Sequence, residues 1–289
     1  MTRSDGGVAP YRALGPRPEE PSPSGAAGWP GAPAWVSSPD PRPDARVRLF
    51  CFPYAGAGAS VFHSWPALVP ASVEVCLIQL PGREGRLFEP ACSELPALVE
   101  QLGHAVRPWL DRPFGFFGHS MGALIAFELA RALRKATAPE PTHLFVSAHC
   151  APHLRTRGPL LHRLTDSELL LRLRQLNGTP DEVLANVELM RLLLPTLRAD
   201  CMLCETYEHA PGEPLACGVT ALGGREDPAV AEAELEAWRR HTRGPFELQM
   251  LPGDHFYLHS ARPRLLRLIV GRLTRDRRSR AGRARDGSA

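Results

Sequence analysis

The chain has 289 residues, of which 44% are hydrophobic and 22% charged, the composition of a globular protein with material for a sizeable core. It contains no apolar run of roughly 18 residues, and residues 1–45 lack the apolar stretch of a secretory signal, so we expect no membrane span and no export by that route. The net charge is +3, and seven irregularly spaced cysteines favour reduced thiols in the cytoplasm over a disulfide framework.

Residues 1–45 differ in composition from the rest of the chain. They hold ten of the 30 prolines and almost no periodic apolar residues. Such a segment cannot bury enough surface to offset the entropy cost of ordering it, so we expect a disordered Pro-rich extension. From Arg46 onward, short apolar runs alternate with stretches of helical spacing, which predicts one folded domain over residues 46–273.

Strands and helices alternate along the predicted domain. Val47–Phe52 is β-branched and aromatic and stops at Pro53, as expected of a strand that ends in a loop. Further strands are predicted at residues 73–80, 114–117, 143–148, 219–222 and 246–251, and helices at 94–110, 121–134, 166–176, 181–194, 230–240 and 262–273.

This alternation indicates an α/β fold with a mostly parallel sheet covered by helices on both faces. Two leucine-rich helices between residues 160 and 200 interrupt the alternation, as an inserted subdomain would. We therefore expect a helical lid at about residues 150–205.

The end of the chain is basic. Residues 271–289 carry seven arginines against two aspartates. A nucleic-acid-binding domain presents a basic face interleaved with aromatic residues, and this sequence offers only a basic terminus. We expect no nucleic-acid partner and interpret residues 274–289 as a disordered, solvated Arg-rich tail.

The pentapeptide Gly118-His119-Ser120-Met121-Gly122 lies between a predicted strand and a predicted helix. A G-x-S-x-G sequence in that context is typical of a nucleophile elbow, where small glycines permit a sharp turn that lifts the serine above the sheet edge. The pattern alone is weak in a chain with 25 glycines, and the flanking elements are what make it specific. Ser120 is therefore the candidate nucleophile.

A serine hydroxyl is a poor nucleophile unless a base accepts its proton, and the base needs a third group to hold its tautomer. His255 follows the strand at residues 246–251 and is the first candidate base. His259, one turn further on, is the second choice. We expect His119 to pack beside the elbow, because neighbouring side chains on a turn diverge.

The candidate acid is Asp227, which follows the strand at residues 219–222 and leaves the same sheet edge as the serine and the base. Glu226 is the local alternative. Asp254 is adjacent to the candidate base in sequence but awkwardly placed to reach its ring. Asp200 lies in the predicted lid, where we expect a surface or capping residue.

Acyl transfer creates an oxyanion that needs backbone N–H donors. The elbow geometry supplies the amide of Met121, and the loop over residues 52–58 should supply the second. Ala55 is the favoured donor, with Tyr54 as the alternative.

The C-x-x-C pair Cys201 and Cys204 lies in a helical stretch and is assigned to core packing. No nucleotide or metal motif occurs, so we expect no cofactor and no metal.

Taken together, these residues resemble the type II thioesterases of modular polyketide and nonribosomal peptide synthesis, over about residues 46–273. The resemblance rests on a series of motifs in order: residues 49–56 with Ser60, Phe62 and Trp65; Pro81-Gly82-Arg83; the serine pentapeptide; residues 197–200 with Tyr207; residues 223–228; and residues 253–258. Two departures are Ala57 and Asp254, at positions where glycine is common in the family.

The resemblance implies an α/β-hydrolase fold, a Ser120–His255–Asp227 triad, an oxyanion hole formed by the amides of Ala55 and Met121, and a mobile lid. It also implies hydrolysis of acyl groups from the phosphopantetheine arm of acyl or peptidyl carrier proteins, by a monomer, to clear stalled synthases. The alternatives are a small-molecule carboxylesterase, an acyl-CoA thioesterase, or a catalytically idle docking module.

Overall fold

The computed structural model describes residues 35–154, 159–176 and 181–286. These residues form a seven-stranded sheet in the order β1-β3-β2-β4-β5-β6-β7, in which β1 pairs antiparallel with β3 and every other pair is parallel. The strands are β1 (Val36–Ser37), β2 (Val47–Phe52), β3 (Val73–Ile78), β4 (Phe114–His119), β5 (His143–Ser147), β6 (Gly218–Gly224) and β7 (Phe246–Leu251).

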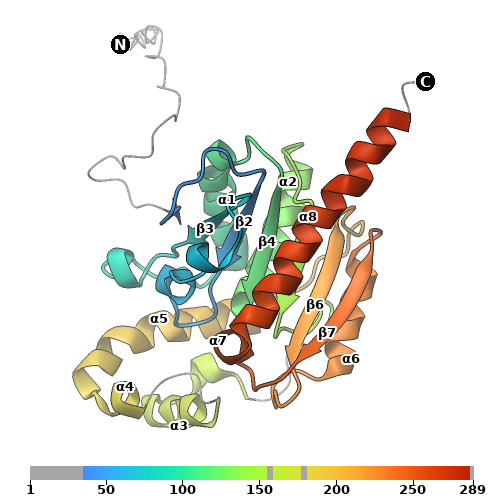
Figure 1. Ribbon diagram of the computed structural model, residues 1–289. Coiled ribbons are helices and arrows are strands. Elements are labelled where there is room, and N and C mark those ends of the chain that lie inside the picture. Colours follow the sequence, from blue (N-terminus) through green and yellow to red (C-terminus); the bar gives the residue numbers. More distant parts are fainter. Residues whose placement is uncertain (1–34, 155–158, 177–180, 287–289) are drawn as a thin grey trace, which may run out of the picture. The chain divides into compact units, whose positions relative to one another are not determined.

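Helices cover both faces of this sheet (Figure 1). The α-helices are α1 (Leu95–Val106), α2 (Met121–Lys135), α3 (Asp166–Leu176), α4 (Asp181–Ala185), α5 (Val187–Glu205), α6 (Glu232–Glu236), α7 (Tyr257–Ser260) and α8 (Arg262–Asp286). Short 3₁₀ turns are η1 (Ala59–Phe62), η2 (Pro66–Leu68), η3 (Glu84–Arg86), η4 (Arg107–Trp109), η5 (Leu161–Arg163) and η6 (Ala237–His241). The predicted α/β architecture with an inserted helical segment is confirmed.

The strands supply apolar side chains to both faces, because successive residues of a strand point in opposite directions. In β2, Phe50 and Phe52 join the core beneath α1 and α2, whereas Leu49 and Cys51 join the core on the other face, beneath α8. All four are fully buried. This two-sided burial explains why residues 49–52 are a continuous apolar run and not an alternating one.

A missing side chain lets α8 pack closely on the sheet. A Cβ atom at Gly115 in β4 would lie 2.6 Å from the side chain of Leu273, so a larger residue there would force that side chain of α8 to move. Leu265, Leu266 and Ile269 continue the buried stripe of α8 at helical spacing.

We call α3, α4 and α5 the helical insert. Its leucines form a small apolar cluster of their own, which includes Leu169, Leu184 and Leu194. The sequence predicted one helix over residues 181–194, and that prediction is wrong in detail. The chain breaks at Asn186, whose side chain accepts a hydrogen bond from Leu189 N–H and begins α5, and α5 then continues through Pro195 to Glu205.

The boundary predicted for the N-terminal extension also needs correction. Residues 1–34 lie outside the described part of the chain, but residues 35–45 are ordered against the domain: Gln79 N–H donates to Trp35 O, and Val36 pairs with Ile78. The guanidinium of Arg42 donates to the carbonyls of Pro66, Val69, Pro70 and Val73. Hydrogen bonds to one arginine order this proline-rich stretch, and apolar periodicity does not reveal them.

At the other end, α8 continues to Asp286, although the sequence predicted a helix ending at Leu273 and a disordered tail from residue 274. Arginine and alanine, which dominate residues 275–286, are good helix formers, so the helix can extend beyond the residues that pack on the sheet. In the described residues, no helix is long and apolar enough to cross a membrane.

Candidate active site

Ser120 lies on a sharp turn between β4 and α2, with φ 52° and ψ −120°, a backbone conformation that L-residues rarely adopt. A Cβ atom at Gly118 would lie 2.1 Å from the carbonyl oxygen of Gly122, and one at Gly122 would lie 2.2 Å from that of Phe52. Both glycines are therefore required by close backbone approach. The amide of Ser120 donates to Ser147 O at 2.7 Å, which fastens the turn to β5.

The structure brings the three predicted side chains together. His255 Nε2 lies 3.2 Å from Ser120 Oγ, and His255 Nδ1 lies 2.8 Å from Asp227 Oδ2. The second oxygen of Asp227 accepts the amide of Ala229 at 2.8 Å. The Asp227 side chain is fully shielded from solvent, so its charge acts on the imidazole without screening by water.

The alternative acids and base from the sequence lie close by but serve the loops. Glu226 accepts the amide of Gly253 at 2.6 Å, and Asp254 accepts the amide of Phe256 at 2.8 Å. His259 meets the hydroxyl of Tyr54 at 3.3 Å. These contacts hold the loop of His255 from both sides, and none of the three side chains joins the Ser120–His255–Asp227 chain.

A buried polar chain lies behind the elbow. His119 Nδ1 is 2.8 Å from Ser147 Oγ, and that hydroxyl is hydrogen-bonded to the hydroxyl of Tyr257. The ring of His119 packs edge-on against His255, as expected, with centroids 5.5 Å apart. Burial, and then the neighbouring His255, holds the pKa of His119 well below its usual range, so this imidazole is neutral.

Residues 53–58, which follow β2, form a loop beside the elbow that we call the oxyanion loop. In the described part of the chain, the amide of Ala55 has no hydrogen-bond acceptor, and Met121 is the first residue of α2, where an amide has no partner within the helix. The ring of Tyr54 packs on Phe256, with centroids 5.1 Å apart. The amides of Ala55 and Met121 thus have no acceptor among the described residues, as the predicted role of oxyanion donors requires.

Asp200 corrects the sequence-based expectation. We expected a surface or capping residue, but Asp200 is 1% exposed and forms a buried ion pair with Arg83, while its Oδ2 also accepts the amide of Gly56 at 2.7 Å. Arg83 and Asp200 are 117 positions apart, so no local pattern could have indicated their contact. Ser147 and Tyr257 were likewise missed, because each looks like an ordinary core residue in sequence.

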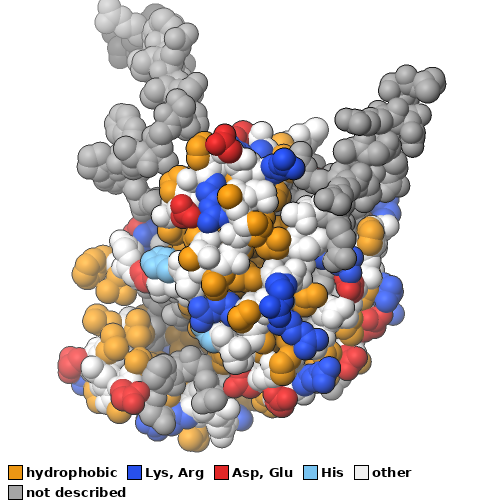
Figure 2. Space-filling model, viewed as in Figure 1, with side chains coloured by type: hydrophobic (Ala, Val, Ile, Leu, Met, Phe, Trp, Pro, Cys, Tyr) orange, Lys and Arg blue, Asp and Glu red, His pale blue; other side chains and the backbone are white. Residues whose placement is uncertain are grey.

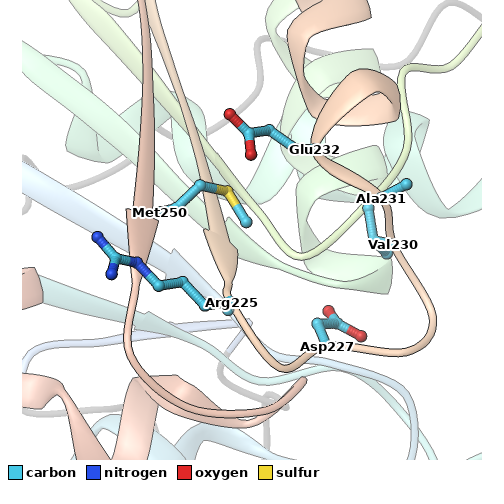
Figure 3. Close-up of a pocket in the computed structure, with 7 residues that line it drawn as sticks. Arg225, Asp227, Val230, Ala231, Glu232 and Met250 are labelled. Atoms are coloured by element: carbon cyan, nitrogen blue, oxygen red, sulfur yellow. The ribbon is translucent and has the colours of Figure 1, made fainter.

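An open pocket of about 410 Å³ adjoins the acid (Figure 3). Besides Asp227, it is lined by Arg225 at the end of β6, Glu232 at the start of α6 and Met250 of β7. Ser120 and His255 are not among its lining residues. Among the described residues, no three His, Cys, Asp or Glu side chains are grouped to hold a metal ion.

Residues 47–273 match the family model described as the thioesterase domain. The chain belongs to the thioesterase family. It is 47% identical over 242 residues to linear gramicidin dehydrogenase LgrE of Brevibacillus parabrevis, covering 83% of this chain and 92% of that protein. It is 42% identical over 226 residues to thioesterase PikA5 of Streptomyces venezuelae, covering 78% and 80%.

Among solved structures, this thioesterase is similar to BorB, the type II thioesterase of the borrelidin biosynthetic cluster, with a TM-score of 0.77 and 39% identity over 84% of this chain and 98% of BorB. These likenesses confirm the α/β-hydrolase fold and the thioester hydrolase activity predicted from the sequence.

Proposed function

We propose that this thioesterase releases acyl groups from the phosphopantetheine arm of acyl or peptidyl carrier proteins, and so clears polyketide or nonribosomal peptide synthases blocked by an unsuitable acyl group. The observation that carries the proposal is the continuous hydrogen-bond chain from Ser120 through His255 to Asp227 at the nucleophile elbow. The names of relatives support the substrate: GrsT of Aneurinibacillus migulanus, 44% identical, is a gramicidin S biosynthesis protein.

In the first half of the reaction, Ser120 Oγ attacks the thioester carbonyl while His255 Nε2, 3.2 Å away, accepts its proton. Asp227 holds the proton on Nδ1 and stabilises the imidazolium. The amides of Ala55 and Met121 stabilise the oxyanion of the tetrahedral intermediate. The C–S bond then breaks, and His255 returns the proton to the departing thiolate.

Water completes the cycle. His255 takes a proton from a water molecule as its oxygen attacks the acyl-serine carbonyl, and a second tetrahedral intermediate forms in the same oxyanion hole. When the ester bond breaks, the proton passes to Ser120 Oγ and the free carboxylic acid leaves. No cofactor or metal is needed for either half, and we expect the protein to act as a monomer.

The test is to load a carrier protein with short acyl groups and to compare acid release by the parent and by Ser120→Ala. We expect the parent to release the acyl group and the variant to lose activity by about 10³-fold or more. Equal release by the two proteins would remove the nucleophile assignment.

Two further experiments test the alternative functions. Turnover of small oxygen esters or acyl-CoA far above that of acyl-carrier thioesters would make the protein a general esterase or an acyl-CoA thioesterase. If a fluorophosphonate probe did not label Ser120 in the folded parent protein, the fold would serve as a docking module.

A further inference from the structure

The helical insert is fastened to the oxyanion loop by a buried carboxylate. Asp200, on α5, uses both oxygens: Oδ1 accepts from Arg83 Nη2 at 2.8 Å, while Oδ2 accepts from Arg83 Nη1 at 2.7 Å and from the amide of Gly56 at 2.7 Å. With three donors converging on it, this carboxylate is fixed in position. It touches no reacting atom of the triad.

Arg83 also binds the oxyanion loop directly, at the residue after Gly56. Its side chain is 4% exposed, its Nη1 also donates to Ala57 O at 3.2 Å, and its Nε donates to Pro81 O at 3.2 Å. Gly56 and Ala57 are therefore held at once, Gly56 through its amide and Ala57 through its carbonyl. Three segments that are far apart in sequence, after β2, after β3 and on α5, meet at this ion pair.

Stability alone does not account for such a pair. Removing two charges from water costs free energy comparable to their attraction, and replacing a buried ion pair with apolar residues of similar volume is often neutral or stabilising. A buried ion pair is better suited to fixing one arrangement of the groups that it bonds. Here those groups include the peptide that joins Ala55 to Gly56.

That peptide lies next to the proposed oxyanion donor. Gly56 has φ +78°, a conformation that favours glycine, and a side chain there would meet Leu197 of α5 at 3.1 Å. Because Gly56 N–H points to Asp200, the plane of the Ala55–Gly56 peptide is set by the docked insert. Ala55 N–H belongs to the preceding peptide, and only the φ and ψ torsions of Ala55 separate the two peptides. Fixing the Ala55–Gly56 peptide therefore restricts the directions in which Ala55 N–H can point.

We propose that Asp200 is a positioning residue of the oxyanion hole, which couples the docked position of α5 to the direction of the Ala55 amide. The oxyanion hole is complete only while α5 lies against the oxyanion loop. The inference rests on the proposed role of Ala55 as an oxyanion donor, and it does not depend on whether the acyl group arrives on a carrier protein.

The test is Asp200→Asn, which keeps the size of the side chain but removes the charge and leaves one oxygen to serve three donors. Loss of a whole oxyanion donor costs about 10²- to 10³-fold in kcat, so misdirection of one donor should cost about 10- to 100-fold. The KM for a p-nitrophenyl ester should change less than about threefold, because the oxyanion forms only in the transition state.

A second readout isolates the oxyanion hole from the rest of the reaction. An alkyl boronic acid forms a tetrahedral adduct with Ser120 that places an oxygen where the oxyanion develops. We expect the inhibition constant of this boronic acid to rise in Asp200→Asn by a factor similar to the fall in kcat. A purely structural role would lower the melting temperature without this selective loss.

The matched control is Thr196→Val, one turn earlier on the same helix. Thr196 Oγ1 donates to Gly82 O at 2.7 Å, so the control removes a bond between α5 and the core without touching Gly56. We expect its kcat and its boronic acid inhibition to stay within about twofold of the parent. If Thr196→Val and Asp200→Asn lose activity equally, or if Asp200→Asn keeps the parent kcat, the positioning role is wrong.

Arg83→Lys provides a second route if Asp200→Asn does not fold. Lysine keeps the buried positive charge but cannot donate to both oxygens of Asp200 in the bidentate geometry of a guanidinium. We expect a smaller loss in the same direction, and unchanged boronic acid inhibition in a folded Arg83→Lys protein would overturn the proposal. Since both assays use small molecules, a failure to hydrolyse carrier-bound substrates would count against the proposed function alone.

Discussion

Asp227 has both carboxylate oxygens engaged, one by His255 Nδ1 and the other by the amide of Ala229. Asparagine at this position would keep its oxygen on the Ala229 amide and turn its NH₂ group toward Nδ1. The imidazole would then carry its proton on Nε2, the nitrogen that faces Ser120, and could not act as the base.

We therefore expect Asp227→Asn to lower kcat by about 10³- to 10⁴-fold at neutral pH. The measurement is steady-state hydrolysis of a small thioester. The control is Glu226→Gln, since the side chain of Glu226 accepts the Gly253 amide and does not bond to His255. If Glu226→Gln lost this activity while Asp227→Asn kept it, the acid would be Glu226.

The buried hydrogen bonds that link His119, Ser147 and Tyr257 predict an effect of single residues on stability. Tyr257→Phe removes the hydroxyl that contacts Ser147, and the loss of a buried hydrogen bond should cost about 1–3 kcal/mol of unfolding free energy. Urea denaturation measures this as a lower midpoint with an unchanged slope. Tyr54→Phe is the control, because its hydroxyl lies at an exposed contact with His259 and should cost far less. Equal losses would contradict the prediction.

Among the elements, the junction between the helical insert and the core depends on three histidines. His153 follows β5 on the way into the insert, His209 follows α5 on the way out, and His241 ends η6. His153 Nδ1 and His241 Nε2 are 2.7 Å apart, and the rings of His209 and His241 have centroids 5.0 Å apart. Burial, followed by the charges of His153 and His209, lowers the pKa of His241 to about 4.

This shift predicts a pH dependence with a definite sign. Between about pH 6.5 and pH 4 the unfolded chain protonates His241 while the folded chain does not, so the stability present above pH 6.5 is lost as the pH falls toward 4. His241→Gln lacks this proton uptake and should lose less stability over that range, by on the order of 2 kcal/mol. Urea denaturation at pH 7.5 and pH 4.5 measures the difference, and parallel losses in both proteins would contradict it.

At the scale of the whole molecule, basic side chains gather over the first turns of α8 and the neighbouring ends of β6 and β7 (Figure 2). Arg264 and Arg267 on α8 and Arg225 after β6 are exposed. α8 begins seven residues after His255. Carrier domains are typically acidic. Complementary charge of this kind raises the association rate more than it adds to affinity.

We expect the double variant Arg264→Glu, Arg267→Glu to lower kcat/KM for an acyl-carrier substrate by about tenfold at low ionic strength. The loss should shrink as salt is added, because screening shortens the range of the charges. Hydrolysis of a small thioester should be unchanged. Arg107→Glu, in η4 before the start of β4, is the control for a charge reversal away from the active site. A salt-independent loss would mean that the face does not steer the carrier.

Much of this protein follows from local patterns in its sequence. The apolar strands, the amphipathic helices and the serine pentapeptide could be placed without coordinates, because each depends on neighbouring residues: β2, α3 and β7 have the predicted bounds. The predicted strand before each of Ser120, Asp227 and His255 also pointed to them, since parallel strands deliver their following loops to one edge of a sheet.

Only the tertiary structure decided which groups support these residues. The sequence predicted a surface or capping role for Asp200 and a disordered extension that included residues 35–45. Asp200 is instead buried against Arg83, and Arg42 binds four carbonyls between Pro66 and Val73. Both errors have one physical reason. A charged side chain is buried or exposed according to its partner, and when that partner lies tens of residues away, periodicity and composition carry no trace of it.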